Sequence, residues 1–143
     1  RETYRAAQTV HRAGANEPRS ASTAIYYMLC DGAHSAWHRL KSDEAWHFYA
    51  GAPLLVHVLD RAGKLTTHRL GNALTHADTV FQAIVLAGDW FAAECEDPQS
   101  FAVVGCTVAP GFEFSEFEVA DVSALQAQYP AHRELIARLG PVA

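Results

Sequence analysis

The sequence has few cysteines and no pattern that would join them. Cys30, Cys95 and Cys106 lie far apart, they form an odd set, and no C-x-x-C pair occurs. A disulfide framework is therefore not expected. We expect reduced, mostly buried thiols, because free cysteine is among the most buried residue types. This cysteine usage is typical of a cytoplasmic protein.

Long apolar runs and clusters of basic charge are also missing. No stretch is long enough to span a membrane, and the first residues do not form a signal peptide, so no membrane partner is expected. The net charge is -5 without any basic run, and nucleic acid is therefore not expected as a partner. The sequence begins at Arg1 and not at methionine, so we expect that a preceding segment has been removed.

The composition is that of one folded domain. Hydrophobic residues make up 50% of the 143 residues, which is enough to build a sizeable core. No internal repeat, low-complexity segment or linker is present. We therefore expect residues 1–143 to form a single domain.

Short runs rich in β-branched and aromatic residues recur along most of the chain, with turn signals between them. The predicted strands are 24–29, 36–40, 45–49, 53–60, 65–70, 81–86, 90–94, 100–108 and 113–119. Regular spacing of short strands predicts an all-β fold, an antiparallel sandwich or barrel.

The C-terminal residues follow a different pattern. Asp121 is a good helix N-cap, and leucines follow it at helical spacing as far as Gly140 and Pro141. Pro130 divides this segment into two short helices, the second over 131–139. We therefore expect short C-terminal helices that cover the β domain.

A pattern of residues at fixed spacing begins at Gly32 and includes a histidine and a glutamate. Five residues lie between Gly32 and His38, and one residue lies between His38 and Leu40. Three residues then separate Leu40 from Glu44, and six separate Glu44 from Gly51. This spacing resembles the first cupin motif, G-x5-H-x-H-x3,4-E-x6-G, except that Leu40 stands where the motif has its second histidine.

The stretch LAGDWF resembles part of the second cupin motif, G-x5-P-x-G-x2-H-x3-N. Gly88 matches its turn glycine, while Leu86 replaces its proline and Phe91 replaces its histidine. Two of the four usual metal ligands of a cupin are therefore absent.

Longer blocks sharpen the resemblance. RETYRA, HRLKSDEAWHFYAG, LAGDWFAAE and VGCTVAPGFEFSEFEVAD are similar to the signature blocks of the cupin-5 family, DUF985, which is grouped with the RmlC-like jelly rolls. The resemblance implies a double-stranded β-helix (the cupin jelly roll), usually a homodimer, with a pocket for a small-molecule ligand in the mouth of the barrel. In that family a His-Pro-Glu-Gly-Gly segment usually precedes the first block, and it is missing here. Relatives by fold include sugar-nucleotide epimerases, dioxygenases, decarboxylases and storage proteins.

The resemblance places His38, Glu44 and His47 in that pocket. Alternation along a strand puts His38 and Leu40 on one face, because their offset is even. Glu44 and His47 have an odd offset, but we expect the KSDE turn to reset the register so that both face the pocket. A histidine oriented by a carboxylate can accept and donate protons. We therefore expect an isomerase-, epimerase- or lyase-type enzyme for a small polar carbonyl substrate, with a sugar derivative among the options. His38 would be the base, supported by Glu44 and His47.

Two alternatives remain open. The same three residues, His38, Glu44 and His47, are able to bind one divalent ion, because imidazole and carboxylate suit zinc, nickel or iron. The protein would then be a metal-dependent enzyme of dioxygenase or decarboxylase type. The degraded metal motif instead favours a non-catalytic protein that binds a small ligand.

Further residues are expected to touch the substrate. The candidates are Tyr27, Lys41, Trp46, Tyr49, Gln82, Phe91 and Glu94. Either Tyr27 or Tyr49 would be the acid, and the sequence does not choose between them. The histidines without ligand spacing, such as His57, are interpreted as surface or strand residues.

Two terminal blocks allow more than one interpretation. Arg1, Glu2 and Tyr4 lie either over the pocket or in a frayed terminus. The phenylalanines of the predicted strand 113–119 and Phe112 before it are expected to form a buried face. The acidic residues of the same strand form either a solvated face or a dimer contact.

Overall fold

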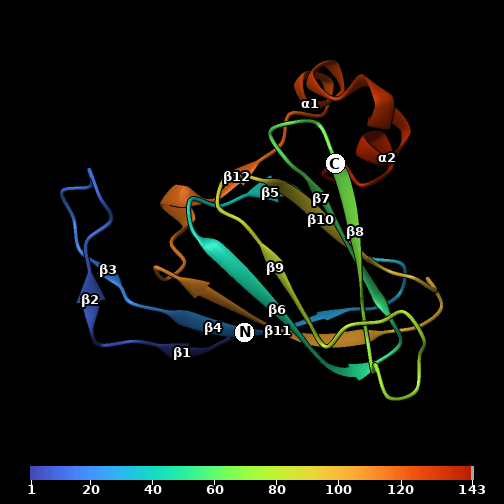
Figure 1. Ribbon diagram of the computed structural model, residues 1–143, viewed down its shortest axis with the longest axis horizontal. Coiled ribbons are helices and arrows are strands. Elements are labelled where there is room, and N and C mark those ends of the chain that lie inside the picture. The colour runs from blue at the N-terminus through green and yellow to red at the C-terminus, as the bar shows by residue number, and fades with distance from the viewer. Residues whose placement is uncertain (143) are drawn as a thin grey trace.

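Two antiparallel sheets face each other in the computed structural model, which describes residues 1–142 (Figure 1). Within these residues the first sheet has the strand order β1-β4-β11-β6-β9 and the second has the order β12-β5-β10-β7-β8. The first sheet consists of β1 (Glu2–Arg5), β4 (Thr23–Leu29), β6 (Asp43–Gly51), β9 (Gln82–Val85) and β11 (Ala102–Ala109). The second consists of β5 (His34–Arg39), β7 (Leu54–Leu59), β8 (Leu65–Leu70), β10 (Trp90–Cys95) and β12 (Glu118–Val119).

The chain passes repeatedly from one sheet to the other. β4 is followed by β5, β6 by β7, and β9 by β10 and then β11, so that each of these strands lies in the sheet opposite to its predecessor. β7 and β8 instead pair with each other within the second sheet. The repeated passage from sheet to sheet is the winding of a double-stranded β-helix. The predicted all-β jelly roll is confirmed, and the strand predicted over 65–70 has the observed bounds of β8.

A two-stranded hairpin extends from the N-terminal end of the first sheet. It is formed by β2 (Thr9–Val10) and β3 (Arg19–Ser20), and Figure 1 shows it beyond the edge of the barrel. Arg12 of the hairpin donates a hydrogen bond to Ser42 at 2.5 Å. The hairpin is therefore attached to the turn between β5 and β6.

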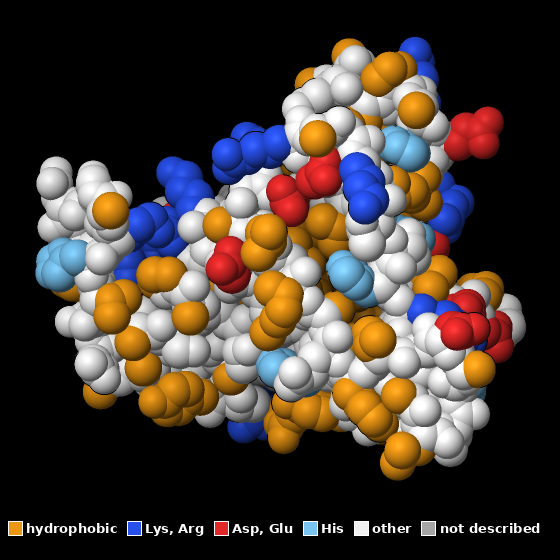
Figure 2. All heavy atoms as spheres, viewed as in Figure 1, with side chains coloured by type: hydrophobic (Ala, Val, Ile, Leu, Met, Phe, Trp, Pro, Cys, Tyr) orange, Lys and Arg blue, Asp and Glu red, His pale blue; other side chains and the backbone are white. Residues whose placement is uncertain are grey.

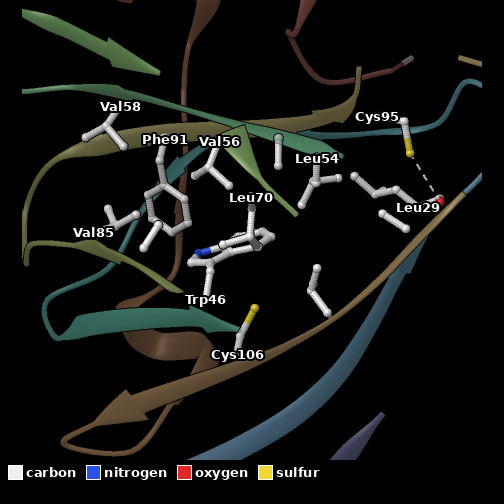
Figure 3. Packing of buried hydrophobic residues seen from close by; sticks show 14 of the residues in the cluster. Leu29, Trp46, Leu54, Val56, Val58, Leu70, Val85, Phe91, Cys95 and Cys106 are labelled. Atoms are coloured by element: carbon white, nitrogen blue, oxygen red, sulfur yellow. Dashed lines mark hydrogen bonds between the residues drawn. The ribbon is translucent and has the colours of Figure 1, made fainter. Parts of the chain in front are cut away.

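The space between the sheets is filled by the inward side chains of both. Alternation along β6 buries Glu44 and Trp46 and turns Ala45 and His47 to the other face. Figure 3 shows the Trp46 ring beside Leu70 and below Phe91. Large buried side chains such as these contribute about 1.5–3 kcal/mol each.

The outer face of the second sheet is covered by the C-terminal helices, as predicted (Figure 1). α1 (Val122–Gln128) begins after Asp121, whose Oδ1 accepts a hydrogen bond from the Ala124 amide at 2.8 Å. Pro130 ends this helix, and the chain continues through the 3-10 turn η2 (Pro130–His132) into α2 (Arg133–Arg138). No helix among residues 1–142 has both the length and the apolar character needed to cross a membrane.

The strand predicted over 113–119 is wrong. This segment forms a 3-10 turn, η1 (Phe114–Glu116), and only Glu118–Val119 pairs as β12. Glu116 forms ion pairs with Arg12 and Arg19 of the hairpin, and these contacts draw the segment away from a regular sheet. The phenylalanine face is not buried either, because Phe114 is 81% exposed and Phe117 is 37% exposed.

Candidate functional site

A cavity of about 460 Å³ opens between the inner face of the first sheet and the segment that follows β11. Its walls come from β4, β5, β6 and β11, and its mouth comes from β1 and residues 112–117. The lining residues are Glu2, Arg5, Thr23, Ile25, Tyr27, Ser35, His38, Leu40, Glu44, Trp46, Cys106, Val108, Phe112, Glu113, Phe114 and Phe117. Most of this lining is apolar, with the ionisable groups at the inner end and at the mouth.

His38 lies on β5 and faces the cavity. Its Nδ1 is 2.7 Å from the Ala36 carbonyl oxygen, and since a carbonyl oxygen only accepts, Nδ1 carries the hydrogen. The lone pair of the neutral ring is therefore on Nε2. Burial lowers the pKa of His38 to about 4, and the bond to Ala36 opposes this change. His38 is therefore neutral at physiological pH.

Glu44 lies at the start of β6 and is 7% exposed. Burial raises its pKa to about 7, while the neighbouring Trp46 and Cys106 side chains act in the opposite direction. The Trp46 and Cys106 side chains therefore lie close enough to the carboxyl group to act as hydrogen-bonding neighbours, although among residues 1–142 neither Glu44 Oε2 nor Trp46 Nε1 has a partner in full hydrogen-bonding geometry. Glu44 is therefore a buried carboxyl group that exists in both protonation states near neutral pH.

Apolar side chains occupy the positions of the two replaced motif histidines. Leu40 follows the end of β5 and lines the cavity together with His38, as their even offset predicts. Phe91 on β10 is 1% exposed, and its ring centroid is 4.0 Å from that of His38. These two side chains exclude water from one side of the imidazole.

The predicted metal ligands do not come together. Glu44 and His47 belong to the uninterrupted strand β6, where an odd offset places them on opposite faces. The preceding KSDE turn therefore cannot change their relative register. In the described part of the chain no three His, Cys, Asp or Glu side chains are grouped to hold a metal ion. The residues present do not fit the metal centre of a four-ligand cupin.

His47 and two of the predicted substrate contacts lie on the outer face of the first sheet. His47 Nε2 is 2.9 Å from Thr107 Oγ1, and its Nδ1 is 3.1 Å from Gln82 Nε2. The Tyr49 ring lies across Gly105, where an added Cβ atom would be 2.4 Å from the hydroxyl oxygen. The expectation that His47, Gln82 and Tyr49 face the pocket is thus corrected.

Tyr27 and Trp46 line the cavity, and Phe91 lies directly behind its wall. The Tyr27 and Trp46 rings pack edge to face with centroids 6.1 Å apart. Burial raises the pKa of Tyr27. Of the two tyrosines considered as acids, Tyr27 is the one that the structure places in the cavity.

Lys41 and Glu94 lie elsewhere. Lys41 is exposed in a separate surface groove next to Leu40. Glu94 is on the outer face of β10, where Arg138 donates to its Oε1 at 2.8 Å and lowers its pKa. His57 Nε2 is 3.1 Å from the same oxygen. His57, expected to be an ordinary strand residue, is thus a buried member of an ion-pair network beneath α2.

The mouth of the cavity contains residues that the motifs did not identify. Arg5 donates to Glu2 at 2.7 Å and to Glu113 at 3.0 Å. Strand β1 pairs with β4, so the N-terminal block lies over the pocket and is not frayed. The only signal in the sequence was that Arg5 belongs to the RETYRA block.

These features define a cupin barrel whose cavity holds one neutral histidine and one buried carboxyl group. The family described as Cupin superfamily (DUF985) matches residues 1–120, and the chain belongs to this family. No relative was found among the curated proteins.

Solved structures share the fold, two of them over 99% or more of this chain. Protein SO0799 from Shewanella oneidensis is 35% identical, with a TM-score of 0.87 over 100% of this chain and 86% of that one. A hypothetical protein from Leishmania major is 27% identical, with a TM-score of 0.86 over 99% and 88% of the two chains. Oxalate decarboxylase from Bacillus subtilis, at 14% identity and a TM-score of 0.58 over 83% of this chain and 31% of that one, is similar in fold alone.

Proposed function

We propose that this chain is a small-molecule enzyme that isomerises, epimerises or eliminates from a carbonyl compound by proton transfer. The observation that carries the proposal is the pairing of a carboxyl group of pKa about 7 with a neutral imidazole in one cavity. A group with a pKa near the working pH is the most effective general acid or base. Glu44 meets this condition, and His38 supplies a free lone pair.

The two residues have complementary parts in such a step. The proton on the carbon next to the carbonyl group moves to His38 Nε2, and the electron pair of that C–H bond forms the C=C bond of an enol. The Glu44 proton moves to the carbonyl oxygen. Return of a proton to the opposite face gives an epimer, return to another carbon gives an isomer, and loss of a neighbouring group gives elimination.

The surroundings of the two groups support this division of roles. The imidazolium that forms on His38 is stabilised by the carboxylate that forms on Glu44, because opposite charges attract strongly where water is excluded. Tyr27 is the tyrosine placed to act as a further acid. His47, expected to support His38, takes no part in this proposal.

Deuterium exchange tests the proposal without knowledge of the natural substrate. Small ketones such as cyclohexanone and hydroxyacetone are incubated with the protein in D2O, and the α-hydrogen signals are followed by NMR. We expect exchange that is faster than in buffer and that is lost in Glu44→Gln and in His38→Ala. Exchange that is equal in the wild type and both variants would contradict the proposal.

The same panel separates catalysis from binding alone. A ketone that raises the melting temperature without exchanging its hydrogens identifies a non-catalytic ligand-binding protein. Such a result would favour the alternative that the protein binds a small ligand without catalysing a reaction.

We also propose that the protein is a cytoplasmic homodimer that pairs through the outer face of the first sheet. Tyr26, Met28, Tyr49 and Ile84 lie on three strands of that face and are each more than half exposed. Figure 2 shows hydrophobic side chains spread over the region where Figure 1 places β6 and β9. A stable contact buries about 800 Å² on each partner, and a twofold axis makes one such face self-complementary. The three free cysteines support the location.

Sedimentation velocity tests the dimer. Met28→Lys places a charge on the face and should shift the protein toward monomer. Leu74→Lys is the matched control, because Leu74 is 86% exposed and lies in the loop between β8 and β9, outside the strands of the sheet. A wild type that sediments as a monomer refutes this contact.

A further inference from the structure

We infer that a surface groove beside the cavity binds a dianionic phosphate group, which Lys41 and Arg61 hold. The inference does not depend on the proposed function, because neither residue takes part in the proton transfer. It gives Lys41, which lies outside the cavity, a ligand in the place where the structure puts it.

The groove has a volume of about 570 Å³ and shares Leu40 and Phe117 with the lining of the cavity. Alternation at the end of β5 explains this arrangement. His38 and Leu40 line the cavity, whereas Arg39 and Lys41, at odd offsets from them, line the groove. The other lining residues of the groove are Arg61, Ala87, Gly88, Ser115, Glu116 and Glu118.

The groove has more positive charge than its own acidic residues neutralise. Glu118 pairs with Arg39 at 2.7 Å, and Glu116 is already paired with two arginines of the hairpin. In the described part of the chain, no carboxylate lies within ion-pair distance of the Lys41 ammonium group or the Arg61 guanidinium group. Figure 2 shows Lys and Arg side chains beside acidic ones in the region where Figure 1 places β5 and β12. Two exposed cations are therefore free to bind an anion.

Gly88 determines where the Arg61 side chain lies. A Cβ atom at Gly88 would be 2.5 Å from Arg61 Nη2, so the guanidinium group lies directly against the glycine backbone. This contact orients a planar set of N–H donors, which matches two oxygens of one phosphate group. Lys41 adds a compact second charge.

Three aspartates of this region do not line the groove. Asp43 and Asp60 each accept a hydrogen bond from a backbone amide through Oδ1, at 2.8 Å and 2.9 Å. Burial raises the pKa of Asp89, and the nearby charge of Arg61 opposes this change. A phosphate group therefore competes with the Asp89 carboxylate for Arg61, and removal of that carboxylate should strengthen binding.

A dianion matches the two free cations better than a monoanion does. A phosphate monoester has a second pKa of about 6, so it carries nearly two negative charges above neutral pH. Free phosphate and a phosphorylated organic compound share this chemistry, and the experiment distinguishes them.

The test is titration with inorganic phosphate, phenyl phosphate and acetate at constant ionic strength and about pH 8. Proton–nitrogen NMR follows the backbone amide signals of Lys41, Gly88 and Ser115 in the groove. The signals of Arg5 and Glu113 are the controls, because Arg5 is the arginine at the mouth of the cavity. We expect both phosphates to move the groove signals at millimolar concentration and acetate to bind several-fold more weakly.

Substitutions locate the charges that hold the phosphate group. Arg61→Gln and Lys41→Gln should each weaken phosphate binding by about twofold to fivefold, the range for exposed charge pairs. Asp89→Asn should strengthen binding by a similar factor. Lys64→Gln is the matched control, because it removes a charge from the same β7–β8 turn as Arg61 but lies outside the groove.

Gly88→Ala tests the geometry without a change of charge. Its methyl group displaces the guanidinium group, so binding should weaken as it does in Arg61→Gln. Alanine is strained at the positive φ of Gly88, and the melting temperature is therefore measured at the same time. Arg61→Gln provides the test if Gly88→Ala does not fold.

Phenyl phosphate identifies the source of the phosphate group. Tighter binding than inorganic phosphate, with movement of the Tyr27 and His38 signals, assigns a phosphorylated compound whose organic part enters the cavity. Movement confined to the groove assigns a phosphate site that is independent of the cavity.

Three results would overturn the inference: acetate binding as tightly as phosphate, equal losses in Arg61→Gln and Lys64→Gln, or signals that move at the mouth of the cavity and not in the groove. Absence of a saturable shift with either phosphate at millimolar concentration would also overturn it. Each of these results leaves the deuterium-exchange test of the enzyme unaffected.

Discussion

The raised pKa of Glu44 predicts a stability that falls as the pH rises, and Glu44→Gln should remove this fall. The folded protein holds the Glu44 proton up to a pH of about 7, whereas the ordinary value is 4.5. Between these values the folded state binds more protons than the unfolded state, so the free energy of unfolding decreases with increasing pH. The difference corresponds to about 3 kcal/mol, and above pH 7 the full cost of the buried charge is present.

His38 acts in the opposite direction. Its folded pKa of about 4 lies below the ordinary value of 6.5, so it makes stability rise with pH over that range. Because His38 is present in both proteins, the difference between Glu44→Gln and wild type isolates the carboxyl group. That difference should grow in favour of the variant by about 3 kcal/mol between about pH 4.5 and about pH 8.

Urea unfolding followed by tryptophan fluorescence at several pH values measures this difference. Glu96→Gln is a control of opposite sign, because hydrogen bonding to Arg69 lowers the pKa of Glu96. That carboxylate stabilises the protein above its unfolded pKa, so its removal should cause a small loss at neutral pH and none in acid. Parallel stability curves for wild type and Glu44→Gln would show that Glu44 is not held protonated and would refute the reasoning.

Three further substitutions test other parts of the structure by the same unfolding measurement. Phe91→Ala should cost about 3–5 kcal/mol, because it leaves a cavity in the core; a loss below about 1 kcal/mol would mean that the ring is not packed as described. His57→Ala should cost about 1–3 kcal/mol, since Glu94 loses one of its buried partners, and an unchanged midpoint would contradict that network. Gly51→Ala should be far more damaging than Gly14→Ala: both have positive φ, but a Cβ atom at Gly51 would lie 2.2 Å from a backbone oxygen, whereas Gly14 has nothing within 4 Å. Equal losses for the two variants would count against the close approach at Gly51.

The strands were predictable because their signals are local. Apolar alternation and turn residues lie within each segment, and β8 and β4 were located from them alone. The segment after β11 was not predictable in this way. Its conformation depends on Glu116, which pairs with Arg12 and Arg19 from a hairpin far away in sequence. The periodic pattern within residues 113–119 does not indicate that Glu116 pairs with these arginines.

The site was predictable to the extent that strand alternation was applied consistently. His38 and Leu40 were placed on one face by their even offset, and the structure agrees. The same rule applied to Glu44 and His47 would have separated them, but a change of register at the preceding turn was allowed. The Arg5 contacts at the mouth depend on the pairing of β1 with β4, which no local pattern reveals.

The replacement of two motif histidines accounts for the chemistry proposed for the two groups that remain. Leu40 and Phe91 offer neither a charge nor a hydrogen bond, the Phe91 ring packs on His38, and His38 and Glu44 are both buried. Desolvation penalises whichever form is charged, so it lowers the pKa of the imidazole and raises that of the carboxyl group. Both groups are therefore driven toward their neutral forms, in which one has a lone pair and the other has a proton. A single apolar environment thus prepares a base and an acid together, and restoring polarity at Phe91 would weaken both.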